Sequence, residues 1–349
     1  MSVTPAETRA MQDALGLAAQ GQGYVEPNPM VGCVLLSPDG NTLGEGFHRR
    51  FGDAHAEREA LADARQRGNA EQIAGCTAVV TLEPCNHTGK QPPCTDALIE
   101  AKVGRVVAAM RDPDPRVAGT GFAKLREAGI DVSIGLGETE ARRLNAPFLK
   151  RVEQSLPWVI AKWGQTLDGK VATAGGDSQW ISNALSRTIV HELRARVDAV
   201  MIGVGTAERD VPRLTARDVD VRRVARRVVV DRSGRFQREG FDVIDGNDLR
   251  GGLKRLSEQG VTNILLEGGP TLMGAMFDEG LVDEAWAFVA PKVLGDAAGR
   301  SAVETPRRSC ESIKQAWGLV LENVEQVGGD VWLRYRTTCH QAQLKTHQA

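Results

Sequence analysis

The sequence predicts a two-domain α/β protein. Its 349 residues are about twice the length of an ordinary domain. Segments typical of strands alternate with segments typical of helices, which indicates a mostly parallel sheet covered by helices. The alternation stops at a short polar segment and then restarts. We therefore expect one domain at 1–149, a linker at 150–157, a second domain at 158–338 and a polar tail at 339–349.

The first domain is expected to begin with a helix and a β-hairpin. Thr4-Pro5-Ala6-Glu7 is typical of a helix start, with a capping box and a proline at the first helical position, and predicts a helix to about residue 19. Pro38-Asp39-Gly40-Asn41 is a turn sequence that joins strands expected at 30–37 and 41–48. The remaining expected elements are helices at about 54–67, 95–102 and 121–129, and strands at 76–82, 105–110 and 130–135.

The second domain is expected to begin and end with hairpins. Asp168-Gly169 lies between two strand-like runs within 158–174 and predicts a tight hairpin turn. Gly328-Gly329 predicts a second turn between the last two strands, at 318–327 and 330–336. Between these hairpins we expect helices at 182–197, 249–260 and 270–280, and strands at 198–203, 226–231, 262–269 and 283–291.

Composition narrows the class of protein. Hydrophobic residues make up 42% and charged residues 25%, which is typical of a globular chain. The net charge of −2 argues against a mainly electrostatic partner such as nucleic acid. No apolar run approaches the roughly 20 residues that a membrane helix needs, and the first residues do not resemble a signal peptide. Six cysteines in so long a chain do not suggest a disulfide framework, so we expect a cytoplasmic protein.

Four residues of the first half have the pattern of a catalytic zinc site. His55 opens an expected helix, Cys85 follows an expected strand, and Cys94 starts the next helix. One imidazole and two thiolates would leave the fourth tetrahedral position of Zn²⁺ open for water. Glu57 lies two residues after the histidine and could carry protons without binding the metal. This set is typical of zinc deaminases, in which the metal activates water.

Each part of the pattern alone has a plainer interpretation. A His-x-Glu tripeptide is usually a helix surface, and two cysteines nine positions apart are more often core or loop thiols. Only their joint occurrence favours the zinc site. Cys33 and Cys76 lie in strand patterns and are interpreted as small core residues. Cys310 and Cys339 have no partner motif.

Four motifs together resemble one family. EPNPMVGCVLL, HAE, TLEPCNHTGKQPPC and RDPDPRVAG resemble the bifunctional deaminase–reductase of bacterial riboflavin biosynthesis. Cytidine and tRNA-adenosine deaminases carry a close C-x-x-C pair, whereas eight residues separate Cys85 from Cys94 here. The resemblance covers nearly the whole chain. It implies a cytidine-deaminase-like three-layer α/β/α domain followed by a dihydrofolate-reductase-like α/β domain.

The resemblance also implies two reactions on a small-molecule substrate. The first is hydrolytic deamination of 2,5-diamino-6-(5-phosphoribosylamino)pyrimidin-4(3H)-one to 5-amino-6-(5-phosphoribosylamino)uracil, with one Zn²⁺ per chain. The second is NADPH-dependent reduction of the ribosyl to the ribityl chain. Such proteins are commonly dimers or tetramers. Two rival functions remain: a nucleic-acid base deaminase with an appended domain, and a non-enzymatic nucleotide sensor whose zinc is structural.

In the first domain the resemblance assigns zinc binding and catalysis to residues already singled out. His55, Cys85 and Cys94 would bind zinc, and Glu57 would be the proton shuttle. Asn28, in the PNP turn, would orient the pyrimidine through its amide.

Other polar residues of the same domain are assigned to the substrate or to local structure. His87 and Lys90 could meet the ribose phosphate, and Lys90 suits an anion. His48 is either a substrate contact or a polar loop residue. Asp112 is interpreted as the cap of the following turn rather than as a substrate contact.

The second half gives a weaker signal from residues alone. Gly203-Val204-Gly205 lacks the third glycine of a dinucleotide fingerprint. The stretch from Leu266 to Thr271 is a glycine-rich turn from strand to helix, which is either an anion site or a plain turn.

WGQTLDGKVAT, GDSQWIS, GVGTAERDVPRLTAR and LLEGGPTLMGAMF resemble the reductase domain of the same family, and the resemblance implies three groups of residues. The nicotinamide cofactor would contact Gly164, Trp180, Thr206, Asp210, Gly269, Pro270, Thr271, Leu272, Met273, Gly274 and Ala275. The substrate would contact Ser178, Arg194, Leu214, Arg217 and Glu267. Lys162 and Glu267 would lie closest to the reacting carbon, and Arg194 with Arg217 would clamp the substrate phosphate.

Two positions depart from the family pattern. Val211 stands where a second polar residue is usual, and Arg232 stands where a small residue follows the strand. Arg232 lies in a stretch, 213–238, that contains nine arginines. The simplest interpretation of this arginine-rich stretch is a solvated loop and strand edge. Our hypothesis is that Arg232 or Arg235 pairs with the 2′-phosphate that distinguishes NADPH from NADH.

Overall fold

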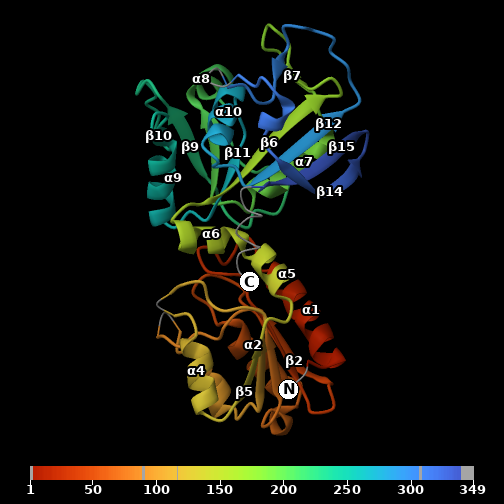
Figure 1. The fold of residues 1–349 in the computed structure, drawn as a ribbon, viewed down its shortest axis with the longest axis vertical. Helices are drawn as coiled ribbons and strands as arrows, with labels where there is room; N and C mark the ends of the chain where they lie inside the picture. Colours follow the sequence, from red (N-terminus) through yellow and green to blue (C-terminus); the bar gives the residue numbers. More distant parts are fainter. Residues whose placement is uncertain (1–2, 89–90, 116, 306–308, 339–349) are drawn as a thin grey trace. The chain divides into compact units, whose positions relative to one another are not determined.

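The chain folds into two compact units, Met1–Ser155 and Leu156–Ala349, in a computed structural model (Figure 1). The structure describes residues 3–88, 91–115, 117–305 and 309–338. The tail expected at 339–349 lies outside these residues. Within the part of the chain that is described, no helix is both long and apolar enough to cross a membrane.

The first unit is built on a five-stranded sheet with the order β2-β1-β3-β4-β5. β1 pairs antiparallel with β2 and β3, and β3, β4 and β5 run parallel. The predicted first hairpin is therefore confirmed. The strands are β1 (Gly32–Leu36), β2 (Thr42–Phe47), β3 (Thr77–Val80), β4 (Arg105–Ala108) and β5 (Asp131–Ile134).

Helices cover both faces of this sheet and form three layers. Side chains of β1 alternate between the faces: Cys33 and Leu35 pack with one core cluster, and Val34 and Leu36 with the other. Cys76 is also fully buried, so the two thiols predicted as core residues are confirmed there. The first cluster includes α2 (Ala56–Gln66), α3 (Cys94–Glu100) and α4 (Thr120–Glu127), and the second includes α1 (Pro5–Ala19), α5 (Glu138–Leu144) and α6 (Ala146–Gln154).

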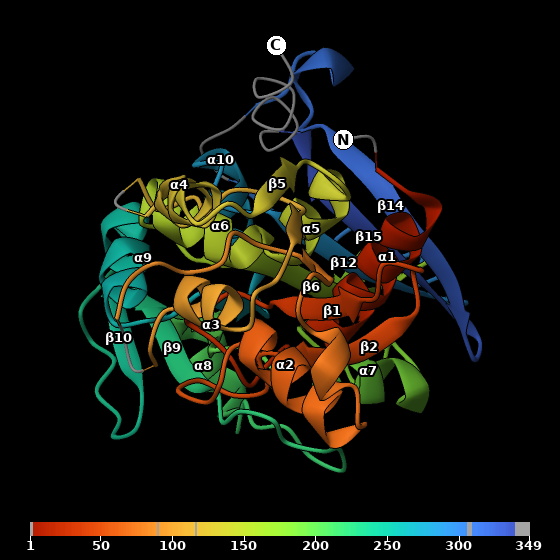
Figure 2. The same cartoon turned by 90° about the horizontal axis from the view of Figure 1, so that it is seen from below.

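Glycines allow α2 to pack directly on the backbone of β2, beside which it lies in Figure 2. A Cβ built on Gly44 would lie 2.5 Å from the carbonyl oxygen of Ala60. A Cβ on Gly46 would lie 2.5 Å from the amide nitrogen of the same residue. Such distances are closer than Cβ atoms tolerate, so only glycine permits this helix position. His55, which precedes α2, is placed by this contact.

The second unit contains an eight-stranded sheet with the order β10-β9-β8-β11-β6-β12-β15-β14. The six strands from β10 to β12 are parallel, and β15 and β14 are antiparallel additions at one edge. Their bounds are β6 (Trp158–Thr166), β8 (Ala199–Gly203), β9 (Arg226–Asp231), β10 (Asp242–Asp245), β11 (Asn263–Leu266), β12 (Glu284–Ala290), β14 (Leu319–Val327) and β15 (Asp330–Thr337).

Helices of the second unit begin at side-chain caps or at the carboxyl ends of strands. Asn183 caps α7 (Ala184–Arg194) by accepting from the amide of Ser186, and Asp248 caps α9 (Leu249–Glu258). α8 (Val204–Asp210) follows β8 directly, and α10 (Pro270–Asp278) follows β11 after a glycine turn. α9 and α10 pack on one face of the sheet with the apolar side chains of its parallel strands.

The structure differs from the expectations at several places. The predicted linker is helical through Gln154, because it continues α6 (Ala146–Gln154), which begins before it and buries Leu149 and Lys150. The strand at 170–172, β7 (Lys170–Ala172), does not form a hairpin with β6 but pairs with β13 (Arg300–Ser301). The Thr166 hydroxyl spans the Asp168-Gly169 turn, since it accepts from the amide of Lys170 and donates to its carbonyl oxygen. α5, α8, β10 and β13 were not expected.

Gly44→Ala should loosen the contact between β2 and α2 by about 1–3 kcal/mol, because the added methyl group must displace helix backbone. The matched control is Gly16→Ala in α1, where nothing lies within 4 Å of a Cβ and alanine favours the helix by up to about 1 kcal/mol. Hydrogen exchange of peptides from α2 should show lower protection in Gly44→Ala and unchanged protection in Gly16→Ala. Equal protection in the two variants would contradict the close contact.

Candidate active sites

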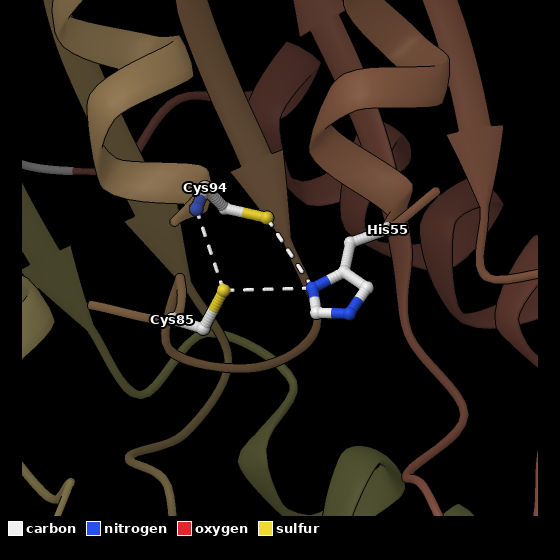
Figure 3. Close-up of side chains that lie close together, drawn as sticks. All are labelled: His55, Cys85 and Cys94. Carbon is white, nitrogen blue, oxygen red and sulfur yellow. Dashed lines mark hydrogen bonds between the residues drawn. The ribbon is translucent and has the colours of Figure 1, made fainter. Parts of the chain in front are cut away.

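Three side chains from three segments of the first unit meet at one point (Figure 3). His55 is the N-cap of α2, Cys94 is the first residue of α3, and Cys85 lies in the segment between β3 and α3. Both sulfur atoms lie 3.5 Å from Nδ1 of His55, and all three ligand atoms lie within 4.8 Å of one another. The amide of Cys94 also donates to Sγ of Cys85 over 3.3 Å.

The donor set fits zinc. Hydrogen bonds from Cys94 and His55 lower the pKa of Cys85 to about 4, so a thiolate is present at neutral pH. One imidazole and two sulfurs are ligands that Zn²⁺ prefers. Among the described residues, no fourth histidine, cysteine or acidic side chain joins this group. The zinc ligands predicted from sequence are therefore brought together, with room for one further small ligand.

Glu57 is buried in the first turn of α2, beside these ligands. Burial and the negative charge of Cys85 raise the pKa of Glu57 to about 7. A carboxyl group with this pKa can both accept and release a proton near neutral pH. Its environment is therefore suited to the proton transfer expected from sequence.

Two of the ligands, His55 and Cys85, border a cavity of about 410 Å³. Asn28 and His87 line it together with His55, Glu57 and Cys85, so the expected pyrimidine contact and one of the two expected phosphate contacts face the same space. Lys90, the other phosphate contact, lies outside the described residues.

His48 fixes the orientation of Asn28. Nδ1 of His48 lies 3.1 Å from the carbonyl oxygen of Ala54, to which it can only donate. Burial lowers the pKa of His48, which favours the neutral ring, so its Nε2 accepts from Nδ2 of Asn28 over 3.3 Å. The amide oxygen of Asn28 thus remains available as an acceptor. Of the two interpretations of His48, this contact supports a role in the site.

Sequence analysis missed part of the cavity wall. Asp112 does cap the next turn, since its Oδ1 accepts from the amide of Asp114, but both aspartates also line the cavity. Phe148 and Arg151 of the unexpected helix α6 form another part of the wall. Glu83, two residues before a zinc ligand, was also missed, although an acidic residue soon after a buried strand is a recognisable signal.

In the second unit, Lys162 and Arg194 enclose Glu267. Arg194 donates two hydrogen bonds to the carboxylate of Glu267, at 2.5 and 2.6 Å, and Nζ of Lys162 lies 4.0 Å from it. Burial acts to raise the pKa of Glu267, but the two cations lower it to about 2. Burial also lowers the pKa of Lys162. Lys162 and Glu267, which the resemblance places near the reacting carbon, therefore lie beside each other. The guanidinium of Arg194 binds Glu267, so in this structure it does not form the expected phosphate clamp with Arg217.

A second cavity, of about 260 Å³, lies at the carboxyl ends of β8, β9 and β11. Six of the predicted cofactor residues line it: Thr206, Gly269, Pro270, Thr271, Leu272 and Ala275. Gly268, at φ 125°, requires glycine, and Thr206 accepts from the amide of Gly269 over 3.3 Å. Arg209, Arg232 and Arg300 also line the cavity, and no acidic side chain among the described residues does. The space therefore suits an anionic ligand.

The other predicted residues of the second unit lie elsewhere. Met273 and Gly274 turn into the interior, where Gly274 packs against the backbone of Glu304, so only their backbone could face a cofactor. Leu214 is buried with a left-handed backbone, whereas Arg217 is exposed. Gly164, Trp180, Asp210 and Ser178 do not line this cavity, and the side chains of Trp180, Asp210 and Ser178 are exposed.

Three arginines of the arginine-rich stretch, 213–238, form ion pairs with carboxylates of the same unit. Arg223 pairs with Asp198 and Arg226 pairs with Asp242. Arg235 binds both carboxylate oxygens of Glu208, at 2.9 and 3.0 Å. Arg232 alone of the two hypothesised residues lines the anionic-ligand cavity.

Comparisons with known proteins identify the family. Residues 5–110 match the cytidine and deoxycytidylate deaminase zinc-binding region, and residues 157–333 match the RibD C-terminal domain. The riboflavin biosynthesis protein RibD of Escherichia coli K12 is 40% identical over 93% of this chain and 97% of its own length. The chain belongs to the RibD family.

Other RibD proteins are similar to this chain over a comparable length. The RibD of Aquifex aeolicus is 36% identical over 93% of this chain and 97% of its own. A solved structure of Acinetobacter baumannii RibD superposes with a TM-score of 0.86 at 37% identity, covering 95% of this chain and 99% of that chain. The expected fold class, a cytidine-deaminase-like domain followed by a dihydrofolate-reductase-like domain, is confirmed. As a RibD protein the chain is a bifunctional enzyme of riboflavin biosynthesis that uses zinc and NADPH.

Cys94→Ser should reduce bound zinc from about one atom per chain to near zero, because it removes one of three protein ligands. Cys76→Ser, in the same domain but away from the ligands, is the control and should keep its zinc. Elemental analysis after gel filtration measures both. Full zinc in the Cys94 variant would refute this ligand assignment.

Proposed function

We propose that the first domain hydrolyses the exocyclic amine of 2,5-diamino-6-(5-phosphoribosylamino)pyrimidin-4(3H)-one and that the second reduces the ribosyl group of the product with NADPH. A solved Thermotoga maritima protein, 33% identical over 95% of this chain, is described as a diaminohydroxyphosphoribosylaminopyrimidine deaminase and 5-amino-6-(5-phosphoribosylamino)uracil reductase. The observation that carries the proposal is the convergence of His55, Cys85 and Cys94 beside the buried Glu57 in an open cavity.

In the deaminase domain, each residue has a distinct task. Zinc, when bound by His55, Cys85 and Cys94, would lower the pKa of a water molecule and so supply the nucleophile. Glu57 accepts a proton from this water molecule and delivers it to the departing amine. Its pKa of about 7 allows both steps. Asn28 holds the pyrimidine through its free amide oxygen.

In the same domain His87 and Lys90 bind the phosphate of the substrate. His87 lines the cavity, which supports this role. The role of Lys90 is supported only by its place in the motif between Cys85 and Cys94.

In the reductase domain, NADPH would supply hydride to C1′ of the ribosyl group. The cavity residues Thr206, Gly269, Pro270, Thr271, Leu272 and Ala275 hold its phosphates, and Gly164, Trp180, Asp210, Met273 and Gly274 complete the cofactor site. Ser178, Leu214, Arg217 and Glu267 contact the substrate, with Arg194 holding Glu267 in place. Lys162, whose pKa burial lowers, is the proton donor nearest the reacting carbon.

Neither rival function accounts for the site as well. A structural zinc would need a fourth protein ligand, and His87 does not join the ligand group. A base deaminase acting on nucleic acid would leave the arginine-lined cofactor cavity of the second unit without a purpose.

Two further features belong to the proposal. We place the enzyme in the cytoplasm, because its zinc ligands require reduced thiols. We also propose a homo-oligomer formed through the reductase domain, whose edge strand β14 exposes Leu321 and Val324.

Glu57→Gln should abolish deamination, at least a hundredfold in kcat, and leave reduction of supplied 5-amino-6-(5-phosphoribosylamino)uracil unchanged. Arg217→Ala should abolish reduction and leave deamination unchanged, because it weakens binding of the substrate phosphate in the second domain. Separate assays of the two half-reactions measure this. If either substitution removed both activities in a folded protein, the division of labour would be wrong.

Arg232→Ser should weaken binding of NADPH about tenfold and leave binding of NADH unchanged, because this guanidinium lines the cavity and would face the 2′-phosphate. Arg235→Ser is the control, since Glu208 already binds that guanidinium. Titration of nicotinamide fluorescence gives both affinities without turnover. An unchanged ratio of NADPH to NADH affinity in the Arg232 variant would dispose of this assignment.

A further inference from the structure

Glu83 is a buried carboxylate that no step of the proposed deamination uses. It is 4% exposed and lies two residues before the zinc ligand Cys85. Its Oε2 accepts from the amides of Asp112 (3.2 Å) and Gly119 (2.9 Å). Its Oε1 accepts from the amides of Gly121 (3.0 Å) and Phe122 (3.3 Å). One side chain therefore satisfies four backbone donors of a segment about thirty to forty positions away.

The segment that Glu83 holds forms one wall of the deaminase cavity. Asp112, Asp114 and Val117 line the cavity from this side, and α4 begins just after them. The hydrogen bonds to this carboxylate come from backbone amides of the segment, and not from its aspartate side chains. The same contact is tight: a Cβ on Gly121 would lie 2.2 Å from the carbonyl oxygen of Pro84.

The two segments joined here carry different parts of the site. Pro84 leads directly to the zinc ligand Cys85, and the other segment contributes substrate-facing side chains. The distance between the zinc ligands and this wall is therefore fixed by Glu83 and by the absence of a side chain at Gly121. Hydrogen bonds to an ionised acceptor are stronger than those to a neutral one, which suits a carboxylate to this task.

We propose that Glu83 is a positioning residue for deamination, which sets the width of the cavity between the zinc ligands and the wall that carries Asp112 and Asp114. Glu83 also lines the cavity, but both of its oxygens are engaged by backbone amides, so we assign it a role through the segment and not directly on the substrate. The proposal rests on the deaminase function proposed above.

The test compares Glu83→Gln with wild type in the full-length enzyme. Glutamine has the same shape, but its amide group would face two of the four backbone donors. We expect KM for deamination to rise about tenfold, kcat to change less than threefold, and zinc content and reduction to stay unchanged, because misplacement of a binding wall costs affinity before it costs chemistry. Glu59→Gln, at a partly exposed residue of α2 that pairs with Arg49, is the matched control.

Gly121→Ala tests the same contact while Glu83 remains intact. The added methyl group pushes the wall away from Pro84, so the same rise in KM is expected without loss of zinc. This variant also decides the matter if Glu83→Gln fails to fold.

Three results would overturn the proposal: an unchanged KM in both variants, loss of zinc, or a fall in kcat with KM unchanged. The last two would mean that Glu83 supports the metal ligands instead. Failure of the underlying function is separately visible, since the wild-type enzyme would then show no deamination.

Discussion

The deaminase site depends on how closely one helix approaches one strand. α2 lies against the bare backbone of Gly44 and Gly46, and its first turn carries Glu57 just after His55. The opposite side of the metal site comes from Cys85 and Cys94, which follow β3 in the same sheet. A side chain between β2 and α2 would move His55 away from both sulfurs. Residues with no chemistry of their own thus set the ligand geometry.

Three buried carboxylates show how environment divides roles among identical groups. Glu57 has no cation that overcomes its burial, so its pKa rises to about 7 and it can exchange protons. Glu267 is also buried, but Lys162 and Arg194 hold its pKa at about 2, so it stays charged and fixes the lysine beside it. Glu83 is satisfied by backbone amides and connects two segments. Glu57 is thus suited to proton transfer, whereas Glu267 and Glu83 are suited to holding neighbouring groups in place.

The sequence predicted what depends on local pattern and motif. The capping box of α1, most strands of the two main sheets and the three zinc ligands were recognisable because spacing and residue type determine them. It could not predict what depends on contacts distant in sequence. β7 leaves its expected hairpin to pair with β13, and Arg194 binds Glu267 instead of facing a phosphate.

Helical segments with mixed polarity were also missed. α5 and α6 have charged residues on most of their surface, and only a few side chains such as Leu149 reach the core. The polar pattern of 150–157 was therefore interpreted as a linker, and no element was expected in the stretch before it. That interpretation concealed Arg151 as a site residue, since a linker was not expected to form a cavity wall, and Phe148 lies just before it in a stretch where no element was expected.

The central claim is that three protein ligands hold zinc and leave one position open to the cavity. X-ray absorption at the zinc edge of the full-length enzyme tests it most directly. The account predicts two sulfur ligands at about 2.3 Å, one imidazole at about 2.0–2.1 Å and one exchangeable oxygen. A second imidazole or a third sulfur in place of that oxygen would show a closed, structural site and would contradict the account.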